Sequence, residues 1–393
     1  MGLQRKGHAV KDPGVVEAAV RRHVESGMGA KVPSAASRDG LRDLSSEQPL
    51  TPMPPSVTQV ASDKMAAGET HYADIAGIQP LKECVCSFLR RLDVEATSDQ
   101  VLITAGEQET RFLCITSQSF HGDARKIALP AVVHPGAGDA AGYRRLEEIE
   151  IQVDGDLQPT LDGINRALDE GADILYLESP NRLTGRVLDE GFTRSVLEAA
   201  DASGATVVWD QGLAPWVHGQ AYRGALSYGI TDSVRAMGAA TVAVGMESWP
   251  LGYIVSSADV LNGQVRLLKQ IICICTSTVS QWGAVEAHRY IDGRLDDIRE
   301  SLHLRRAEAA DLLSDGAGIE ILSSPTSSHL ALKFADEREF ARAKSVLDEK
   351  GYRYTDGENY GATRVMRLTT TTSFEGIVRA AEILRKDRGR ARR

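Results

Sequence analysis

The stretch 172-ADILYLESPNRLTGRVLDEGFTRSVLEAADASGATVVWDQG-212 contains two apolar runs separated by an amphipathic segment. ADILYLESP (172–180) and ATVVWDQG (205–212) are predicted as buried strands, and LDEGFTRSVLEAADASG (188–204) as the helix between them. Continuous apolar strands that are separated by helices are typical of a parallel sheet covered by helices on both faces. This stretch therefore predicts an α/β fold.

The same alternation extends to both sides of this stretch. Further strands are predicted at VLITAG (101–106), KIALPAVVH (126–134) and TVAVGM (241–246), and further helices at EQETRFLCITSQSF (107–120) and LQPTLDGINRALDEG (157–171). From about residue 285 the pattern changes to long helices with a few alternating strands, among them HLALKFA (329–335) and TRVMRLTTT (363–371). Such a change predicts a second, smaller α+β domain.

Three regions follow from these patterns. Residues 1–60 are expected to form an N-terminal helix (12–27) and an arm rich in Ser, Pro and Gly. Residues 61–284 are expected to form the large α/β domain, and residues 285–393 the small C-terminal α+β domain.

Composition narrows the class of protein. The chain has 393 residues, of which 42% are hydrophobic and 25% charged, as in an ordinary globular protein. The net charge of −9 argues against general affinity for nucleic acid or for anionic membrane surfaces. No signal-peptide pattern and no apolar run of about 18 residues is found, so a cytoplasmic protein is expected.

The five cysteines include two Cys-x-Cys pairs, Cys84/Cys86 and Cys273/Cys275. Residues two apart on a helix point in different directions, which suits a shared metal ion poorly. We therefore expect structural cysteines and no metal site.

In a parallel sheet, ligands bind beyond the carboxyl ends of the strands. Gly106 opens a strand-to-helix turn, a place where helix N–H groups accept an anion, and Glu107 follows it directly. Asp210 ends a buried strand and requires a cationic or hydrogen-bonding partner, which Arg182 in the loop SPNRLTG is placed to supply. Arg367 stands inside the predicted strand VMRLTTT, an unusual position unless it meets an anion.

Five segments, in this order, resemble the fold-type-I family of pyridoxal-phosphate (PLP) aminotransferases (class I/II). The resemblance extends from about Leu44 to the end of the chain. It predicts the aminotransferase fold, with a mostly parallel sheet of the seven-stranded type and a smaller C-terminal domain. The segments are DLSSEQPLTPMPPSV (43–57), HYADIAGIQPLKECV (71–85), VLITAGEQETRFL (101–113), ESPNRLTG (178–185) and VVWDQG (207–212).

Two site residues of the family are retained by this resemblance. Asp210 matches the aspartate that pairs with the pyridine nitrogen, and Arg367 the arginine that binds the substrate carboxylate. At five other positions the resemblance implies a different residue. Arg182 stands where the family has an asparagine, Leu213 where it has a tyrosine, and Val132, with His134 close by, where it has the aromatic residue that stacks on the ring. Glu107 stands in place of a small residue and Glu47 in place of a glycine. If PLP is retained, the resemblance assigns it to Gly106, Glu107, Gln108, Asp210 and Ser248.

The largest difference lies in 246-MESWPLGY-253, where the family has Ser-x-Ser-Lys followed by Arg-x-Gly-Tyr. Trp249 stands at the position of the lysine that carries the cofactor, and Pro250 at that of the phosphate-binding arginine. The family's lysine supplies an amine that acts as the nucleophile, and the side chains of Trp, Glu and Ser cannot supply one. Glu107 would also place a negative charge beside the phosphate. These differences predict a protein without a cofactor and without the catalytic lysine.

The first hypothesis is therefore a diverged enzyme of a biosynthetic pathway that performs PLP-independent elimination, cyclisation or condensation on a small amino-acid-like or carboxylate substrate. Glu107, Asp210, Glu247 and His134 are its candidate catalytic residues, and Arg367, Arg182, Glu47 and Trp249 its candidate substrate-binding residues. One alternative is an aminotransferase-like enzyme that uses PLP or pyridoxamine phosphate (PMP) with a base other than lysine. Another is a non-catalytic ligand-binding or partner subunit.

Structural roles remain open for several of these residues. Asp210 and Arg182 would then be a purely structural pair, and Arg367 a surface residue of an edge strand. Trp249 would be a core residue, His134 a satisfied loop histidine and Glu47 a solvated loop residue. A homodimer is expected from the resemblance, with the N-terminal arm and the segment TSTVSQW (276–282) as candidates for contact with the second subunit.

Overall fold

The computed structural model places residues 39–393 in one compact unit. Within the chain it describes residues 42–47, 53–121, 124–219, 222–241, 245–314, 318–370 and 375–391. The helix predicted at residues 12–27 and most of the predicted arm lie outside the described residues. Helix α2 (Pro55–Ala66) begins inside the last part of that predicted arm.

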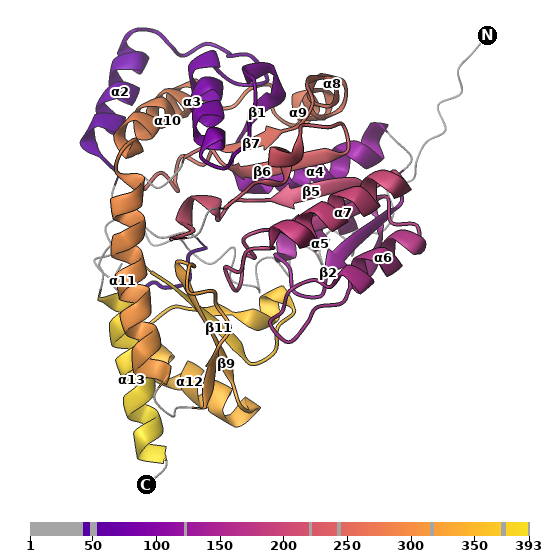
Figure 1. Ribbon diagram of the computed structural model, residues 1–393. Coiled ribbons are helices and arrows are strands. Elements are labelled where there is room, and N and C mark those ends of the chain that lie inside the picture. Colours follow the sequence, from indigo (N-terminus) through magenta and orange to yellow (C-terminus); the bar gives the residue numbers. More distant parts are fainter. Residues whose placement is uncertain are drawn as a thin grey trace, which may run out of the picture. The chain divides into compact units, whose positions relative to one another are not determined.

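The large sheet has seven strands in the order β1-β7-β6-β5-β4-β2-β3 (Figure 1). Strands β2 to β6 pair in parallel, whereas β7 is antiparallel to both of its neighbours, β1 and β6. The prediction of a mostly parallel seven-stranded sheet is therefore confirmed. The strands are β1 (Val101–Thr104), β2 (Lys126–Pro130), β3 (Glu147–Ile151), β4 (Ile174–Glu178), β5 (Thr206–Asp210), β6 (Val234–Ala239) and β7 (Gly252–Val255).

The strand predicted at 241–246 is wrong in position. The strand before this turn is β6, which ends at Ala239, and residues 242–244 lie outside the described part. β6 carries Arg235 and Gly238 inside it, so its sequence VRAMGA has no continuous apolar run. The β7 strand that follows has four residues, too few for a clear pattern.

Helices cover both faces of the sheet because its strands alternate between two apolar clusters. Val207 and Trp209 of β5 pack in one cluster, and Val208 between them packs in the other. The helix α7 between β4 and β5 is capped at both ends. At its start the Asp189 side chain accepts a hydrogen bond from the Phe192 N–H, and at its end Gly204 adopts the left-handed conformation with φ of +76°. Besides α2, the α-helices of this part are α3 (Gln79–Arg90), α4 (Glu107–His121), α5 (Pro135–Arg144), α6 (Leu161–Asp169), α7 (Glu190–Ser203), α8 (Ala258–Val260), α9 (Arg266–Ile272) and α10 (Thr278–Ile291).

A second, antiparallel sheet of four strands follows in the order β10-β11-β9-β8. It packs with long helices around a separate apolar core, as the α+β prediction requires. The predicted boundary at residue 284 falls inside α10, and the domain limits stay a prediction. The elements are α11 (Leu295–Ser314), β8 (Ile319–Ile321), β9 (His329–Phe334), α12 (Glu337–Glu349), β10 (Thr355–Asp356), the short 3₁₀ helix η5 (Gly357–Tyr360), β11 (Val365–Thr369) and α13 (Gly376–Ala391).

The segment 42–47 runs along the small sheet. The Leu44 N–H donates to the Arg353 carbonyl at 3.0 Å, and the Leu44 carbonyl accepts from the Thr369 N–H at 3.0 Å. Leu44 itself is fully buried in the core of this sheet. These contacts bring the side chain of Glu47 to the carboxyl ends of β4 and β5.

Candidate active site

Asp210, the last residue of β5, is fully buried, and four groups hold its carboxylate. Oδ2 accepts from Arg111 Nη2 at 2.9 Å and from the Tyr176 hydroxyl at 2.7 Å. Oδ1 accepts from the Gly212 N–H at 3.0 Å and from the Arg182 guanidinium. Burial opposes ionisation of Asp210, but the two guanidinium groups outweigh it and hold the pKa of this carboxyl well below its usual range.

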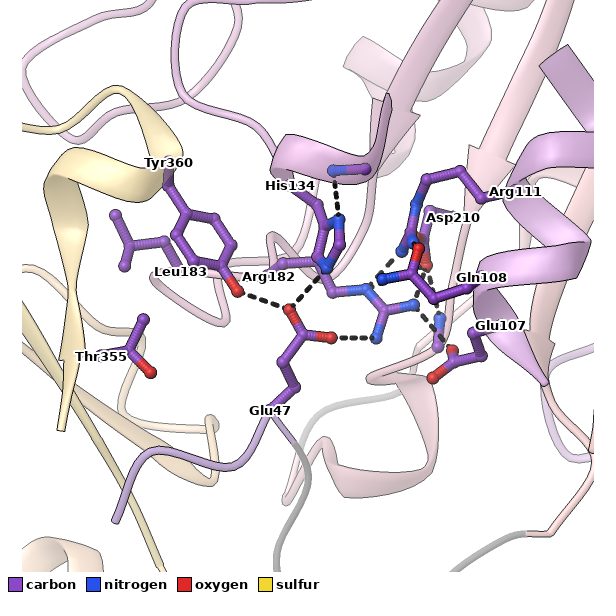
Figure 2. Close-up of polar contacts among 12 residues, drawn as sticks. Glu47, Glu107, Gln108, Arg111, His134, Arg182, Leu183, Asp210, Thr355 and Tyr360 are labelled. Atoms are coloured by element: carbon purple, nitrogen blue, oxygen red, sulfur yellow. Dashed lines mark hydrogen bonds and ion pairs between the residues drawn. The ribbon is translucent and has the colours of Figure 1, made fainter. Parts of the chain in front are cut away.

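Arg182 lies at the centre of the site, where its buried guanidinium contacts three carboxylates (Figure 2). Nε is 3.1 Å and 3.2 Å from the two oxygens of Asp210, Nη2 is 2.7 Å from Glu107 Oε1, and Nη1 is 3.4 Å from Glu47 Oε2. The Arg182 N–H also donates to Glu178 Oε2 at 3.0 Å, which fixes the loop from which the side chain starts. The expected Asp210–Arg182 pair thus exists, as part of a larger network.

Glu47 joins the two parts of the chain across this site. Its Oε1 accepts from the Tyr360 hydroxyl at 2.5 Å and lies 3.1 Å from His134 Nε2. Burial alone would raise the pKa of Glu47, but His134, Arg182 and Arg367 together hold this pKa well below the ordinary value. Glu47 is therefore an ionised, anchored carboxylate.

His134 precedes α5 and is fixed in one tautomer. Its Nδ1 accepts from the Gly136 N–H at 2.9 Å, so in the neutral ring the proton is on Nε2, which faces Glu47. Burial and the nearby Arg111 lower the pKa of His134 to about 4, so the ring is neutral at physiological pH. The His134 N–H donates to Glu178 Oε1 at 2.7 Å.

Arg367 extends from β11 towards the same site, and most of its donors are already bonded. Nη1 donates to the Arg182 carbonyl at 2.7 Å and to the Tyr360 hydroxyl at 3.1 Å, and Nη2 donates to Thr355 Oγ1 at 2.9 Å. Its Nη1 is 3.9 Å from Glu47 Oε1. The buried Nε has no hydrogen-bond partner among the described residues.

Gly106 and the first residues of α4 form the predicted anion-binding turn. Gly106 has φ of +95°, a conformation that favours glycine, and α4 begins directly after it at Glu107. A Cβ atom at Gly106 would lie 2.9 Å from the Pro250 side chain, so the turn around Pro250 packs closely on this glycine. Gln108 accepts from Arg111 Nη1 at 2.9 Å and so also belongs to the network.

Glu247, Ser248 and Trp249 were predicted to join the site, but in the described structure they make no hydrogen bond or ion pair with these residues. Trp249 packs instead against α10, since a Cβ at Gly283 would lie 3.0 Å from its ring. Glu247 is on the surface of its turn, although partial burial raises its pKa. The structure favours the role of Trp249 as a packing residue.

Four residues of the network are not predicted from the sequence. Arg111 and Tyr176 hold Asp210, Tyr360 links Glu47 to Arg367, and Glu178 binds the backbone of His134 and of the Arg182 loop. Burial and the nearby Asp210 raise the pKa of Glu178 to about 7. Arg111 directly follows Glu107, Gln108, Glu109 and Thr110 in the sequence, so no local pattern distinguishes it.

The charges of this site nearly cancel. Three arginines (Arg111, Arg182 and Arg367) face three ionised carboxylates (Asp210, Glu107 and Glu47), while His134 is neutral. We call these seven residues, together with Gln108, Tyr176, Glu178 and Tyr360, the site network. It is a preorganised polar site of the kind that binds a small charged molecule.

Residues 40–384 match the model of the family described as aminotransferase class I and II. The chain belongs to this family. The resemblance that the sequence motifs predicted is confirmed, and so is the fold class.

Curated relatives with related sequences carry different substrates in their names. The probable aspartate aminotransferase of Methanocaldococcus jannaschii is 24% identical over 352 residues, which cover 85% of this chain and 89% of the relative. The aspartate/prephenate aminotransferase of Thermus thermophilus is 25% identical over 361 residues, covering 88% and 91%. The arginine–pyruvate transaminase of Pseudomonas aeruginosa is 22% identical over 347 residues, covering 87% of each chain.

Solved structures show the same fold. A single mutant of Thermus thermophilus aspartate aminotransferase superposes with a TM-score of 0.79 at 20% identity, covering 98% of this chain and 100% of that one. A structure titled Pyrococcus protein-A1 gives a TM-score of 0.81 at 14% identity, covering 96% and 99%.

These comparisons correct the functional prediction. The relatives are named as aminotransferases, so the prediction that a missing catalytic lysine makes this chain PLP-independent is wrong. The prediction that no cofactor is used is wrong for the same reason. The chain is a member of a family of enzymes, and the alternative hypothesis of PLP or PMP chemistry agrees better with its relatives.

The residues present fit this cofactor on one condition. Asp210 is buried and ionised, as a partner of a protonated ring nitrogen must be, and the turn at Gly106 leads to the N–H groups at the start of α4. Arg182, however, lies directly on Asp210 and is bonded to Glu107. The site therefore fits PLP or PMP once the Arg182 side chain has left Asp210.

Proposed function

We propose that this chain is an aminotransferase-like enzyme that uses PLP or PMP and acts on a small amino or keto acid. The observation that carries the proposal is the buried, ionised Asp210, held from one side by Arg111 and Tyr176. In a member of this family, such a carboxylate at the end of β5 is the group that a protonated pyridine nitrogen requires. When bound, the cofactor takes the amino group of an amino acid and gives it to a keto acid.

The clamp of Arg111 and Tyr176 explains how Asp210 stays oriented when Arg182 moves. Both donors bond Oδ2 and the Gly212 N–H bonds Oδ1, whereas Arg182 contacts both oxygens through Nε and Oδ1 through Nη2. When Arg182 leaves, Oδ2 therefore keeps both of these donors, and Oδ1 keeps the Gly212 N–H. Arg111, also buried, keeps the carboxylate ionised in that state.

Proton transfer is assigned in this proposal to a group other than lysine, the pair of His134 and Glu47. The His134 ring is neutral and its tautomer is fixed by the Gly136 N–H, while Glu47 is ionised and partly accessible. Arg367 is assigned to the carboxylate of the substrate. Glu107 lies at the edge of the proposed cofactor site. Its hydrogen bond to Arg182 must break when that arginine leaves Asp210, so it opposes this movement.

We also propose that the enzyme is a homodimer. Helix α9 and the residues after it expose large apolar side chains, of which Ile271 is 70% and Ile274 52% exposed. The segment 276–282, which contains the start of α10, follows directly. Exposed apolar groups of this size suit a subunit interface.

No helix in the described part of the chain is long and apolar enough to span a membrane, and a cytoplasmic location stays a prediction.

A half-reaction tests the proposed function. The protein is incubated with PLP and a mixture of amino acids, and the 2-oxo acid that forms is measured together with the change in cofactor absorbance. We expect stoichiometric formation of 2-oxo acid and PMP by the wild type, and a loss of about a hundredfold or more in Asp210→Asn. Absence of both products with every amino acid would contradict the proposal. Glu95→Gln, on the surface and outside the site network, is the control.

A further inference from the structure

Glu178 is a second buried carboxylate beside Asp210. It is the last residue of β4, it is 4% exposed, and the parallel pairing of β4 with β5 places it opposite Asp210. Whereas Asp210 is bonded to two guanidinium groups, the donors of Glu178 are uncharged. They are the backbone N–H groups of His134 and Arg182 and the side-chain amide of Asn181. Burial without a bonded cation is costly for a carboxylate, and together with the charge of Asp210 it raises the pKa of Glu178 to about 7.

The two ends of the Glu178 carboxylate hold two different loops. Oε1 accepts from the His134 N–H at 2.7 Å, whereas Oε2 accepts from the Arg182 N–H at 3.0 Å and from Asn181 Nδ2 at 3.3 Å. An ionised carboxylate accepts hydrogen bonds at both ends and donates none. An amide of the same shape would turn its NH2 group towards one of the two loops. The need for an acceptor at both ends therefore explains why a carboxylate is buried here.

Glu47 connects the same two residues from the other side. Its Oε1 lies 3.1 Å from His134 Nε2, and its Oε2 lies 3.4 Å from Arg182 Nη1. Figure 2 shows the side chains of His134 and Arg182 converging on Glu47. Glu178 thus fixes the two backbones, while Glu47 contacts the two side chains. The positions of the two loops decide whether both side chains reach Glu47 at once.

We propose that Glu178 is a positioning residue, which holds the backbone of His134 where its ring meets Glu47. This inference rests on the proposed function, in which His134 and Glu47 transfer the proton. The Arg182 side of the carboxylate has two donors and the His134 side has one. In Glu178→Gln the oxygen therefore stays with Arg182 and Asn181, and the NH2 group faces the His134 N–H. Two donors then oppose each other, and His134 moves away from Glu47.

Protonation of Glu178 has the same effect as this substitution. The proton goes to Oε1, which has the single donor, and the resulting O–H faces the His134 N–H. Three ionisable groups act on Glu178: Asp210 on β5 raises its pKa, Arg182 in the loop after β4 lowers it, and Tyr176 lies on β4 itself. The contact with His134 is therefore intact above pH about 7 and weakens as the pH falls through this value.

Histidine NMR tests the inference on the protein without cofactor. Wild type and Glu178→Gln are labelled with 15N-histidine, and the ring signals of His134, assigned by their loss in His134→Gln, are followed from about pH 8 to 5. In the wild type we expect one tautomer, with the proton on Nε2, and the second tautomer to appear as the pH falls through about 7. In Glu178→Gln both tautomers should be present throughout, and the pKa of His134 should rise from about 4 towards about 6.5.

His288 is the internal control for this measurement. It is also buried with a pKa lowered to about 4, but it is bonded to the Ala240 carbonyl, outside the site network. Glu95→Gln is the control for the substitution and should leave both histidines unchanged. If His134 keeps its tautomer and pKa in Glu178→Gln, or if His134 and His288 change alike, the inference is wrong. Should Glu178→Gln fail to fold, a single His134 tautomer in the wild type down to about pH 5 overturns the inference.

The half-reaction separates this inference from the proposed function. Glu178→Gln should bind PLP within about threefold of the wild type, but should form 2-oxo acid between about tenfold and a hundredfold more slowly, because His134 no longer meets Glu47. If the wild type reacts and Glu178→Gln reacts equally fast, the inference is wrong while the proposed function stands. If the wild type takes up no PLP, the proposed function is wrong, and the NMR measurement still decides whether Glu178 positions His134.

Discussion

Arg182 and Asp210 form a fully buried ion pair in which Nε of the arginine lies 3.1 Å and 3.2 Å from the two carboxylate oxygens. In the proposed function Asp210 binds the ring nitrogen of the cofactor, and the pair places a cation of the protein itself on this carboxylate. Under this proposal, cofactor binding requires the Arg182–Asp210 pair to open. The following predictions test this relationship and the network around it.

Replacing the cation should affect stability and cofactor binding in opposite directions. Arg182→Met keeps much of the side-chain volume and removes the charge from Asp210, Glu107 and Glu47. We expect the free energy of unfolding to fall by about 3 kcal/mol, as when one partner of a buried pair is removed, and PLP to bind more tightly. Urea unfolding and PLP titration measure the two effects.

Arg194→Met is the matched control for this change, because Arg194 pairs with Glu190 on the surface of α7. Its loss should leave both the free energy of unfolding and PLP binding nearly unchanged, because an exposed ion pair contributes little to stability. If Arg182→Met were as stable as the wild type and bound PLP no better, the Arg182–Asp210 pair would neither stabilise the fold nor oppose cofactor binding.

The Tyr360 hydroxyl links Glu47 to Arg367, so its removal should loosen the contact between the segment 42–47 and the small sheet. It accepts from Arg367 Nη1 at 3.1 Å and donates to Glu47 Oε1. Tyr360→Phe is expected to reduce the free energy of unfolding by about 1–3 kcal/mol, the cost of unsatisfied charged partners. Tyr143→Phe, in which the tyrosine is 68% exposed, should change it little. If both changes lowered the free energy of unfolding by the same amount, the role of Tyr360 as the link between Glu47 and Arg367 would be contradicted.

Gly212 leaves space for the Arg182–Glu107 pair. A Cβ atom there would lie 1.9 Å from Glu107 Oε1 and 2.1 Å from Arg182 Nη2. Gly212→Ala should therefore separate these side chains and destabilise the protein by about 1–3 kcal/mol. Gly142→Ala, where a Cβ in α5 meets nothing within 4 Å, should instead stabilise it by up to about 1 kcal/mol. A fully stable Gly212→Ala protein with unchanged PLP binding would show that the pair is not closely packed.

Acid should destabilise the protein through its buried histidines. Burial lowers the pKa of His134 and of His288 to about 4, and that of His329 to about 3, whereas an unfolded histidine titrates near about 6.5. Between these values the unfolded state binds more protons, so this stability is complete above pH about 6.5 and is lost as the pH falls towards 4. For His134 alone the loss amounts to about 3 kcal/mol.

His134→Gln isolates this contribution. Its free energy of unfolding should depend less steeply on pH between about 4 and 6.5 than that of the wild type, by one proton. Urea unfolding at half-unit pH intervals measures the slope. An unchanged slope would mean that His134 titrates alike in the folded and unfolded states, which is incompatible with its burial beside Arg111.

The sequence predicts those parts of the fold in which burial leaves a pattern in the chain. β4 and β5 are recognisable because both of their faces are covered, which makes their sequences continuously apolar. β6 is not recognisable, since Arg235 interrupts it and is accommodated by Gln118 and Gln264 from elements far away in the chain. Such compensation depends on tertiary structure and leaves no local signal.

The site shows the same limit. Asp210, Arg182 and Arg367 are predictable because each is a charge at or inside an apolar strand or its loop. The partners Arg111 and Tyr176 occupy interior positions of a helix and a strand, and only the folded chain brings them to Asp210. Trp249 was placed in the cofactor site by its position in a motif, but the path of its turn directs the ring towards α10.

Equilibrium binding of PLP and PMP tests the central claim most directly. Each is titrated into the wild type, Arg182→Met and Asp210→Asn, with absorbance and calorimetry as the measurements. We predict saturable binding of one molecule per chain by the wild type, tighter binding by Arg182→Met and binding at least about a hundredfold weaker by Asp210→Asn. Wild-type protein that binds neither compound, or binds them equally well without the Asp210 charge, would contradict a cofactor site at this carboxylate.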